Sequence, residues 1–568
     1  MTRVRAPRLA GRGGWLNTGG IEPDLRGRFV LLDFWTFCCV NCLHVLEELR
    51  PLEERFGDVL TVVGVHSPKF VHEADHDALV AAVERYAVHH PVLDDPDLET
   101  WKQFAVRAWP TLVLVDPEGY VVHVCSGEGH VEGIGRLLPE LVAEHEARGT
   151  LRRGNGPYVP AEPTPSELSF PGKAMRLPDG RLLVADSSHD SVVVLEGDAV
   201  VRRYPGFLQP QGMCLYDGHL LVADSGHHTV VSLDLESGEL RTVAGTGRVW
   251  RPGDATSGPA LEVNLSTPWD VEVWQGEVVV AMAGTHQLHA LDAGGVRVLA
   301  GTTGEGLRDG DALAAYLAQP SGLAAGSDRL WFVDAETSAL RWYREGQVGT
   351  AVGAGLFDFG HRDGPAAHAL LQHPLGVTVL PDGSVAVSDT YNGAVRRYDP
   401  FSDAVSTLMS GLAEPTDAVV DGDGLLIVES GAHRVTRVPL PQEALVVDGV
   451  AQRTRRPPTD LAPGQVTLRV VFTPPPGQKL DASFGPATRL TVSGDPVTDG
   501  SGTGTDLERS LVLQGESGVL HVAAFAASCD VDAENPACHV TQQDWGIPVR
   551  LVEGAPRELT LVLNGLAP

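Results

Sequence analysis

The sequence predicts a multidomain chain in which an α/β unit is followed by a six-bladed β-propeller and a C-terminal all-β sandwich. Its 568 residues are too many for one hydrophobic core. A phrase of two strands recurs six times in the middle of the chain, and short strands separated by turns follow it. We place the three domains at residues 1–152, 160–445 and 460–568.

The N-terminal unit alternates short apolar runs with amphipathic stretches, as α/β folds do. In the amphipathic stretches, apolar residues recur at intervals of three and four. Strands are expected at Phe29 to Phe34, Leu60 to Val65, Thr111 to Val115 and Val121 to Cys125. Helices are expected at Cys42 to Phe56, Glu73 to Ala87 and Glu132 to Arg148. The pattern predicts a central sheet covered by helices.

The repeated phrase begins with a proline, runs through a strand to an acidic or small polar residue, and ends in a second strand. Its copies start at Pro171, Pro210, Pro268, Pro320, Pro374 and Pro415. A repeat of roughly 40 residues with several strands per unit predicts a propeller, because radial closure protects the edges of each small sheet.

Three intervals between the copies are longer than the others, and we expect their additional residues to form loops on one face, where partners bind. These loops are Thr246 to Asn264, Thr302 to Ala315 and Gly353 to Ala369. The acids Asp186, Asp224, Asp334, Asp389 and Glu429 recur with the repeat, so we interpret them as structural. Histidines near the repeat tips, His227, His228, His286 and His433, are interpreted as ordinary surface residues.

After a polar connector at Arg453 to Pro458, the tail has six or more short strands separated by turns, which predicts a small β-sandwich. Cys529 and Cys538 flank a turn-rich segment near its end. They could close a hairpin disulfide or act as a second redox pair. Two free or loosely paired thiols are favoured, because disulfides are rare in a reducing compartment.

Charge and hydropathy exclude several function classes. The net charge of −31 at pH 7 argues against nucleic acid and anionic lipid as partners, because both attract Lys and Arg. The first 20 residues lack the apolar core of a signal peptide, and no uninterrupted apolar stretch reaches about 18 residues. We therefore expect a cytoplasmic protein with no membrane anchor.

Three of the seven cysteines, Cys38, Cys39 and Cys42, fall within five positions directly after an apolar strand. In Cys39-Val40-Asn41-Cys42 the two sulfurs are three residues apart at the start of a helix, so they can meet in a disulfide. The unpaired N–H groups at that end favour a thiolate on the first cysteine. Cys39 is the expected nucleophile and Cys42 the resolving thiol. Cys38 is either a packed core residue or a regulatory thiol.

Further residues resemble the thioredoxin-like family. Phe34-Trp35 before the cysteines, and Trp109-Pro110-Thr111 ahead of an apolar strand, look like the active-site strand and the cis-proline loop of that family. The resemblance implies a cis peptide bond before Pro110 and makes Asp33 the buried acid that accepts the proton of Cys42. The expected substrate-binding residues are Trp35, Val40, Asn41, Trp109 and Thr111.

Over nearly its whole length the chain resembles the NHL repeat-containing protein 2 family. The resemblance rests on Gly14-Trp15-Leu16-Asn17, the doubled cysteine with Asn41, the Trp-Pro-Thr loop, the propeller and the β-tail. It implies a thioredoxin-like domain joined to a six-bladed NHL propeller. The expected function is a thiol–disulfide oxidoreductase that acts on a protein thiol or disulfide, with a protein partner on the propeller face. The redox-active pair needs no other cofactor.

Two other functions compete with this one. The thioredoxin-like unit could be an adaptor in a non-catalytic scaffold, or acids from several blades could hold calcium in the channel of a propeller hydrolase. No metal site is assigned, because no second Cys-x-x-Cys or His-x-x-x-His follows at zinc spacing. Val40-Asn41 departs from the Gly-Pro of general disulfide reductants, so the direction of electron flow stays open.

Overall fold

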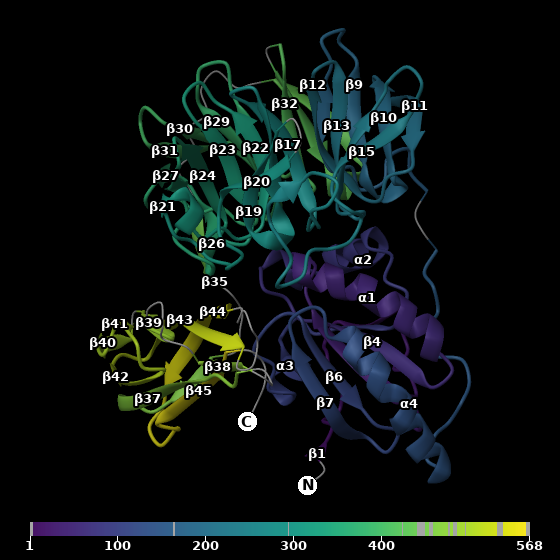
Figure 1. Cartoon of the computed structure of the whole chain (residues 1–568), viewed down its shortest axis with the longest axis vertical. Coiled ribbons are helices and arrows are strands. Elements are labelled where there is room, and N and C mark those ends of the chain that lie inside the picture. Colours follow the sequence, from purple (N-terminus) through teal and green to yellow (C-terminus); the bar gives the residue numbers. More distant parts are fainter. Residues whose placement is uncertain are drawn as a thin grey trace.

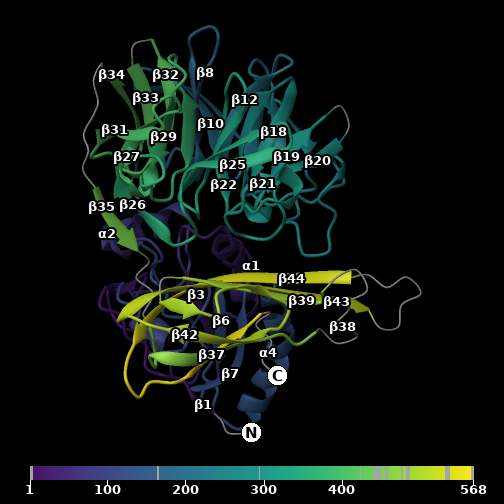
Figure 2. The same cartoon turned by 90° about the vertical axis from the view of Figure 1, so that its left-hand side faces the viewer.

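The computed structural model places the propeller above, with the N-terminal unit and the tail side by side beneath it (Figure 1). A quarter turn shows the long tail strands β43 (Ser517–Asp530) and β44 (Cys538–Leu551) running below the blades (Figure 2). The structure describes residues 4–162, 165–292, 295–422, 424–439, 449–453, 458–474, 478–480, 486–494, 496–530 and 538–563. Connector residues 454–457 and the side chain of Cys538 lie outside this description.

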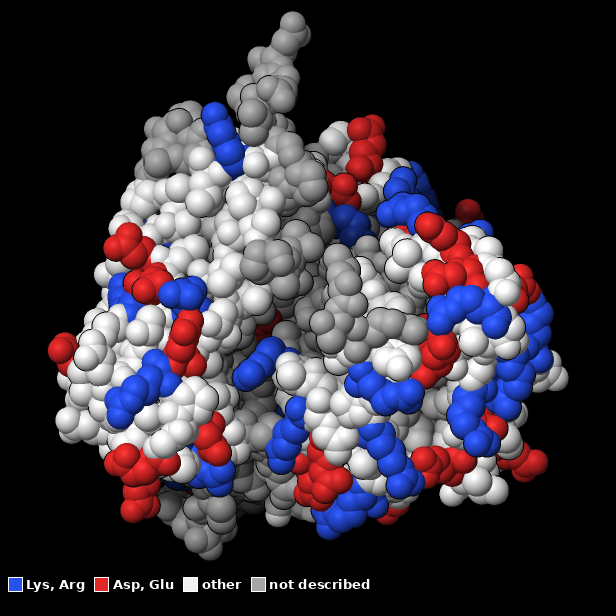
Figure 3. Space-filling view, turned by 90° about the horizontal axis from the view of Figure 1, so that it is seen from below, with Lys and Arg blue, Asp and Glu red and all other residues white. Residues whose placement is uncertain are grey.

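No helix within these ranges is long and apolar enough to cross a bilayer. Seen from below, blue basic and red acidic side chains are interspersed over the surface (Figure 3). Many acidic and basic side chains of the described residues form ion pairs, such as Arg550 with Asp460 at 2.8 Å on the tail. Opposite charges thus alternate on this face although the whole chain is strongly acidic.

A seven-stranded sheet forms the centre of the N-terminal unit, in the order β1-β7-β6-β3-β4-β5-β2. Its strands are β1 (Val4–Arg5), β2 (Gly14–Leu16), β3 (Phe29–Trp35), β4 (Leu60–His66), β5 (Val92–Asp94), β6 (Thr111–Val115) and β7 (Tyr120–Ser126). β3 is parallel to β4 and antiparallel to β6. Both β3 and β4 are buried along their whole length, which explains their unbroken apolar sequences.

Four helices cover this sheet: α1 (Val40–Phe56), α2 (His76–Arg85), α3 (Glu99–Gln103) and α4 (Val131–Ala147). α1 and α4 pack on one face through residues such as Leu49 and Ile134. The helix expected from Glu73 to Ala87 is divided, because the carboxylate of Asp75 accepts hydrogen bonds from two backbone N–H groups and starts α2. A 3-10 turn at His72–Ala74 precedes it.

Six antiparallel sheets form the propeller, which confirms the blade number predicted from the repeat. Blades 1 and 2 contain β8 (Ala174–Arg176), β9 (Leu182–Asp186), β10 (Ser191–Glu196), β11 (Ala199–Pro205), β12 (Pro210–Tyr216), β13 (His219–Asp224), β14 (Thr229–Leu233) and β15 (Leu240–Ala244). Blades 3 and 4 contain β17 (Pro268–Trp274), β18 (Glu277–Met282), β19 (Gln287–Leu291), β20 (Gly295–Ala300), β22 (Pro320–Ala325), β23 (Leu330–Asp334), β24 (Ala339–Arg344) and β25 (Gln347–Val352).

Blades 5 and 6 contain β28 (Gly376–Val379), β29 (Val385–Asp389), β30 (Ala394–Asp399), β31 (Ala404–Ser410), β32 (Pro415–Asp421), β33 (Gly424–Glu429) and β34 (Arg434–Pro439). Blade 6 packs directly on blade 1, where Leu426 and Val428 share a core with Val184. An ion pair of 2.9 Å between Arg176 and Asp421 joins the same two blades. These contacts close the ring.

The recurring blade acids have the structural role predicted for them. Each accepts a hydrogen bond from the backbone N–H two residues before a blade proline. The pairs are Ser169 with Asp186, Leu208 with Asp224, Ala318 with Asp334, Gln372 with Asp389, and Ala413 with Glu429. The donor–acceptor distances run from 2.6 to 3.0 Å. The acids therefore fix the turn that enters each blade.

The three insertions expected as loops each contain a two-residue strand that pairs with the outer strand of its blade. These strands are β16 (Gly258–Pro259), β21 (Gly310–Asp311) and β27 (Gly364–Pro365). The third insertion also contains β26 (Asp358–Arg362), which pairs with β35 (Gly449–Arg453). Two of the insertions contact the N-terminal unit: Arg251 pairs with Glu48 of α1, and the ring of Phe359 lies 4.7 Å from that of Phe70.

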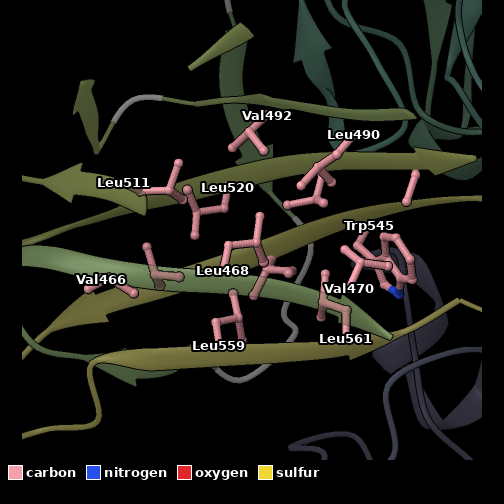
Figure 4. Close-up of a cluster of buried hydrophobic side chains, with 14 of the residues drawn as sticks. Val466, Leu468, Val470, Leu490, Val492, Leu511, Leu520, Trp545, Leu559 and Leu561 are labelled. Carbon is pink, nitrogen blue, oxygen red and sulfur yellow. The ribbon is translucent and has the colours of Figure 1, made fainter. Parts of the chain in front are cut away.

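The tail is a sandwich of two sheets, as predicted. One sheet contains β36 (Thr459–Leu461), β38 (Gln478–Leu480), β39 (Thr488–Ser493), β41 (Gly502–Gly504), β43 and β44, and the other contains β37 (Gly464–Val471), β40 (Val497–Asp499), β42 (Glu508–Leu513) and β45 (Glu558–Val562). Leu468, Leu490 and Leu520 lie fully buried between the sheets (Figure 4). Trp545 lies at the edge of this core.

The propeller channel contains a buried ion cluster. Lys173 of blade 1 lies 3.0 Å from the carboxylate of Asp270 and donates to the carbonyl oxygen of Leu375 at 3.1 Å. Asp417 of blade 6 lies close enough for its charge to act on Lys173. All three ionisable side chains are buried. Acids from several blades therefore do converge, but around a lysine of the same chain.

Replacing Lys173 by Met should lower the free energy of unfolding by about 3 kcal/mol, because it leaves buried carboxylates without their cation. Chemical denaturation of the full chain measures this loss. The double variant Lys173→Met with Asp270→Asn removes one uncompensated charge and should recover part of the stability. Equal stability of the wild type and Lys173→Met would show that the cluster does not depend on the lysine.

Candidate functional site

The cysteines lie where β3 ends and α1 begins. Cys39 is the N-cap residue of α1, with φ −87° and ψ 109°, and its carbonyl oxygen accepts a 2.9 Å hydrogen bond from the N–H of Cys42. The Cys42 thiol forms a hydrogen bond with the Cys39 side chain. Cys38 and Cys42 are buried, whereas Cys39 is partly exposed. Of the three thiols, Cys39 is thus the one that solvent can reach.

Asp33 lies on β3 beneath this pair. It is fully buried, and within the described part of the chain neither carboxyl oxygen has a hydrogen-bond partner. Burial, and secondarily the charge of Glu53, raises the pKa of Asp33 to about 8. Burial also raises the pKa of the Cys42 thiol, and the nearby Asp33 adds to this increase. A neutral acid near a buried thiol can exchange a proton with it.

The cis-proline loop lies beside the cysteines. The Trp109–Pro110 peptide bond is cis, as the family resemblance implies. The indole N–H of Trp109 donates to the carbonyl oxygen of Ser67 at 2.7 Å. The hydroxyl of Thr111 donates to the carbonyl oxygen of Ala108 at 2.8 Å. These bonds hold the loop in place.

Not all five expected substrate-binding residues face open space. Asn41 and Trp109 line a cavity at Cys39. Trp35 is fully buried with its ring 5.4 Å from that of His66, so its assignment to a substrate surface is wrong. Val40 and Thr111 are buried as well. Val40 lines a different cavity, between α1 and the propeller, and the Thr111 hydroxyl is bonded to Ala108. An apolar run entering a central strand places such side chains in the core.

Glu73 organises the cysteine loop and was not identified from the sequence. This buried carboxylate accepts hydrogen bonds from the Thr36 hydroxyl at 2.6 Å and from the N–H of Cys38 at 2.9 Å. It also accepts 2.9 Å bonds from the N–H groups of Lys69 and Phe70. One acid thus connects the loop before Cys39 with the segment after β4.

A ring of six propeller residues faces the N-terminal unit. Each stands directly before a blade proline and has a left-handed backbone, with φ between 43° and 60°; this pre-proline ring is Phe170, Gln209, Thr267, Gln319, His373 and Glu414. In five cases a residue at the tip of the preceding blade accepts the backbone N–H of the ring residue. The acceptors are His433 for Phe170, Asp190 for Gln209, His228 for Thr267, His286 for Gln319 and Ser338 for His373. Three of the four tip histidines interpreted as surface residues, His228, His286 and His433, therefore shape this ring, and His286 is buried. His227 is exposed, as expected.

Gln319 of the pre-proline ring binds the cysteine loop itself. Its side-chain oxygen accepts the N–H of Val40 at 2.5 Å, and its side-chain nitrogen donates to the carbonyl oxygen of Cys38 at 2.9 Å. Beside it, Lys69 and Glu336 form a buried ion pair across the domain boundary. The neighbouring Glu336 carboxylate outweighs the effect of burial and raises the pKa of Lys69.

Other members of the ring contact the helices of the N-terminal unit. The hydroxyl of Thr267 lies 2.5 Å from Nε2 of His44, whose Nδ1 lies 2.6 Å from Glu128. Glu414 pairs with Arg85 and lies 2.8 Å from Nε2 of His72. The Arg85 and Glu414 side chains are largely buried, so this face of the propeller is tightly joined to α1 and α2.

A cavity of about 180 Å³ remains at Cys39. All three domains line it: Asn41 and Trp109 from the N-terminal unit, Glu305 and Phe357 from the propeller, and Trp545 from the tail. Burial raises the pKa of Glu305, and the nearby Lys69 opposes this shift. Cys39 therefore opens into a small space with both acidic and basic side chains in its wall.

The remaining cysteines do not belong to this site. Cys125 and Cys214 are buried in cores, as expected. Cys529 is disulfide-bonded, so the favoured interpretation of two free or loosely paired thiols in the tail is wrong. Cys538 lies opposite it in the register of β43 and β44. Opposed residues of an antiparallel pair are close enough for a disulfide.

Within the described residues, one group has spacing suited to a metal ion: Asp116, Glu118 and His145. Protein contacts already engage its members, because Glu118 pairs with Arg148 and Nδ1 of His145 lies 2.8 Å from the Thr150 hydroxyl. In the propeller channel, Lys173 provides the positive charge that a calcium ion would supply to Asp270. The residues present therefore give the propeller hydrolase no support.

Asp33→Asn should change how stability depends on pH. Between the usual value of 3.8 and about 8, the folded state holds a proton on Asp33 that the unfolded state releases, so the free energy of unfolding should fall as pH rises through this window. The contribution is about 1.4 kcal/mol per pH unit. Urea denaturation at several pH values should show a flatter profile for Asp33→Asn than for the wild type.

Glu54→Gln is the matched control, because Glu54 is an exposed acid on α1. That variant should keep the wild-type slope. Parallel profiles for Asp33→Asn and the wild type would mean that Asp33 does not titrate as a buried acid.

Comparison with known proteins supports this architecture. The family model described as thioredoxin-like matches residues 27–121, and the NHL repeat model matches residues 207–231 and 371–398. Thiol-disulfide oxidoreductase YkuV of Bacillus subtilis is 23% identical over 145 residues, which cover 25% of this chain and 98% of that protein.

Two longer relatives match across the domains. Protein SUPPRESSOR OF QUENCHING 1, chloroplastic, of Arabidopsis thaliana is 34% identical over 484 residues, or 76% of this chain. Human NHL repeat-containing protein 2 is 35% identical over 454 residues, or 69% of this chain. The chain spans 45% of the plant protein and 62% of the human protein. It belongs to the family of NHL repeat-containing protein 2 and combines a thioredoxin-like domain with NHL repeats.

Proposed function

We propose that this protein is a thiol–disulfide oxidoreductase with Cys39 as nucleophile and Cys42 as resolving thiol. The observation that carries the proposal is the asymmetry of the pair: Cys39 is reachable at the positive end of α1, and Cys42 is buried behind it in hydrogen-bond contact. The likeness to a thiol-disulfide oxidoreductase over the N-terminal unit supports the same reaction.

The reaction would begin when the Cys39 thiolate attacks a substrate disulfide. A mixed disulfide forms between Cys39 and one substrate sulfur, and the other sulfur leaves as a thiolate that takes up a proton. Cys42 then attacks the Cys39 sulfur and releases the second substrate thiol. In its ionised form Asp33 is placed to accept the Cys42 proton, and a pKa of about 8 leaves a minor fraction of Asp33 ionised at neutral pH for this step.

Single cysteine variants should separate these roles. Cys39→Ser should abolish reduction of a disulfide substrate, because no nucleophile remains. Cys42→Ser should accumulate the mixed disulfide, since the resolving step is lost, and mass spectrometry under non-reducing conditions measures the adduct. Cys38→Ser is the control and should retain turnover. Undiminished turnover in Cys39→Ser would refute the proposal.

A redox titration distinguishes this function from a non-catalytic scaffold. We expect the Cys39–Cys42 disulfide to form reversibly within roughly −320 to −200 mV, the range spanned by cellular thiol buffers. Alkylation followed by mass spectrometry reports the oxidised fraction at each potential. A pair that stays reduced at every potential would favour the scaffold, in which the thioredoxin-like unit acts as an adaptor.

A further inference from the structure

We propose that the disulfide reduced at Cys39 lies on an extended peptide segment, which occupies a groove between the propeller and the tail. This inference rests on the oxidoreductase function proposed above. It assigns a substrate class to the site from three features: the covered face around Cys39, the size of the cavity beside it, and the groove that meets this cavity.

The propeller covers the face through which a folded protein would approach the cysteine loop. Gln319 binds the backbone on both sides of Cys39, at Cys38 and at Val40. The buried Lys69–Glu336 pair closes the boundary next to it. Separating such a pair leaves charges without partners and costs several kcal/mol. A rigid folded surface could reach Cys39 only by displacing these contacts.

The cavity at Cys39 is too small for a bulky substrate. Its volume of about 180 Å³ corresponds to roughly six water molecules at about 30 Å³ each, and pockets for drug-sized ligands start near 300 Å³. A cysteine side chain with its adjoining backbone is a slender group of the kind that such a space admits. The rest of the substrate must lie elsewhere.

A groove of about 650 Å³ meets this cavity. Leu356, Phe357 and Trp545 line both spaces, so these side chains form the passage between them. The ring of Phe357 packs against Gly546, where a Cβ would lie 2.0 Å from the ring. Phe357 thus holds the propeller insertion against β44 at the entrance to the cavity.

The walls of the groove suit a polypeptide backbone. Thr491 and Thr503 of the tail present hydroxyl groups 2.9 Å apart, and the guanidinium of Arg489 stacks over Phe525 at 5.8 Å. These side chains carry hydrogen-bond donors, and peptide carbonyl oxygens are acceptors. An extended chain advances about 3.3 Å per residue, so a short segment can follow β39 while its cysteine enters the passage.

Two electrons pass from the Cys39–Cys42 dithiol to the peptide disulfide, which is released as two thiols, and the enzyme is left with its own disulfide. A dithiol reductant restores the enzyme for the next cycle.

The test compares three mixed disulfides of methanethiol: with N-acetylcysteine, with the central cysteine of a linear peptide, and with a surface cysteine of a folded protein. The pre-reduced full chain, freed of reductant, reacts with each in a single turnover, and mass spectrometry of acid-quenched samples gives the second-order rate constant. We expect the peptide to react about tenfold faster than N-acetylcysteine, equivalent to 1.4 kcal/mol, and the folded protein to react slowest.

A groove variant makes the test specific. Thr491→Trp fills the groove and should lower the peptide rate to that of N-acetylcysteine, whose own rate stays unchanged. Thr560→Trp, on the other sheet of the tail, is the matched control and should keep the peptide preference. Equal rates for peptide and N-acetylcysteine, or an unchanged peptide rate in Thr491→Trp, would overturn the inference while leaving the oxidoreductase intact. No reaction with any of the three would overturn both.

Discussion

The buried polar contacts between the pre-proline ring and the cysteine loop determine the arrangement of the whole molecule. A buried ion pair or amide is tolerated only where its partners are all in place, so Lys69, Glu336 and Gln319 require one relative orientation of the two domains. The left-handed backbone at Gln319 aims its side chain at the loop. The tail then meets both domains at Phe357 and Trp545, which leaves Cys39 in an enclosed site.

The sequence predicted the parts of the fold that depend on local patterns. Six blades follow from six prolines, and Cys39 and Cys42 follow from their spacing after one apolar strand. Asp33 and the cis bond before Pro110 follow from the resemblance to the thioredoxin-like family. The pre-proline ring could not be predicted in the same way. Its members differ in chemistry, and the contact of Gln319 with Val40 joins residues about 280 positions apart. A residue before proline is also ordinarily extended, whereas these six residues are left-handed.

The residues that were wrongly predicted to be exposed have one physical feature in common. Trp35 and His286 belong to polar or aromatic types that occur both at surfaces and in interiors, so type alone does not locate them. The neighbouring domain determines whether such a residue is exposed or buried. His286 accepts the N–H of Gln319 at 3.2 Å and is buried beneath the N-terminal unit. The repeat tips carried a usable signal, since histidine recurs there at His228, His286 and His433 and a periodic position favours a structural role.

The docking of the propeller on the N-terminal unit also affects the chemistry of Cys39 and Cys42. The first N–H groups of a helix are the donors that stabilise a negative sulfur at its N-terminus. Gln319 takes one of them, the N–H of Val40, so the propeller binds the same end of α1 at which Cys39 lies. Stabilising the thiolate favours the reduced dithiol over the disulfide. The propeller is therefore part of the proposed redox site as well as its cover, because one amide side chain both closes the approach to Cys39 and binds the end of α1 whose dipole would stabilise a Cys39 thiolate.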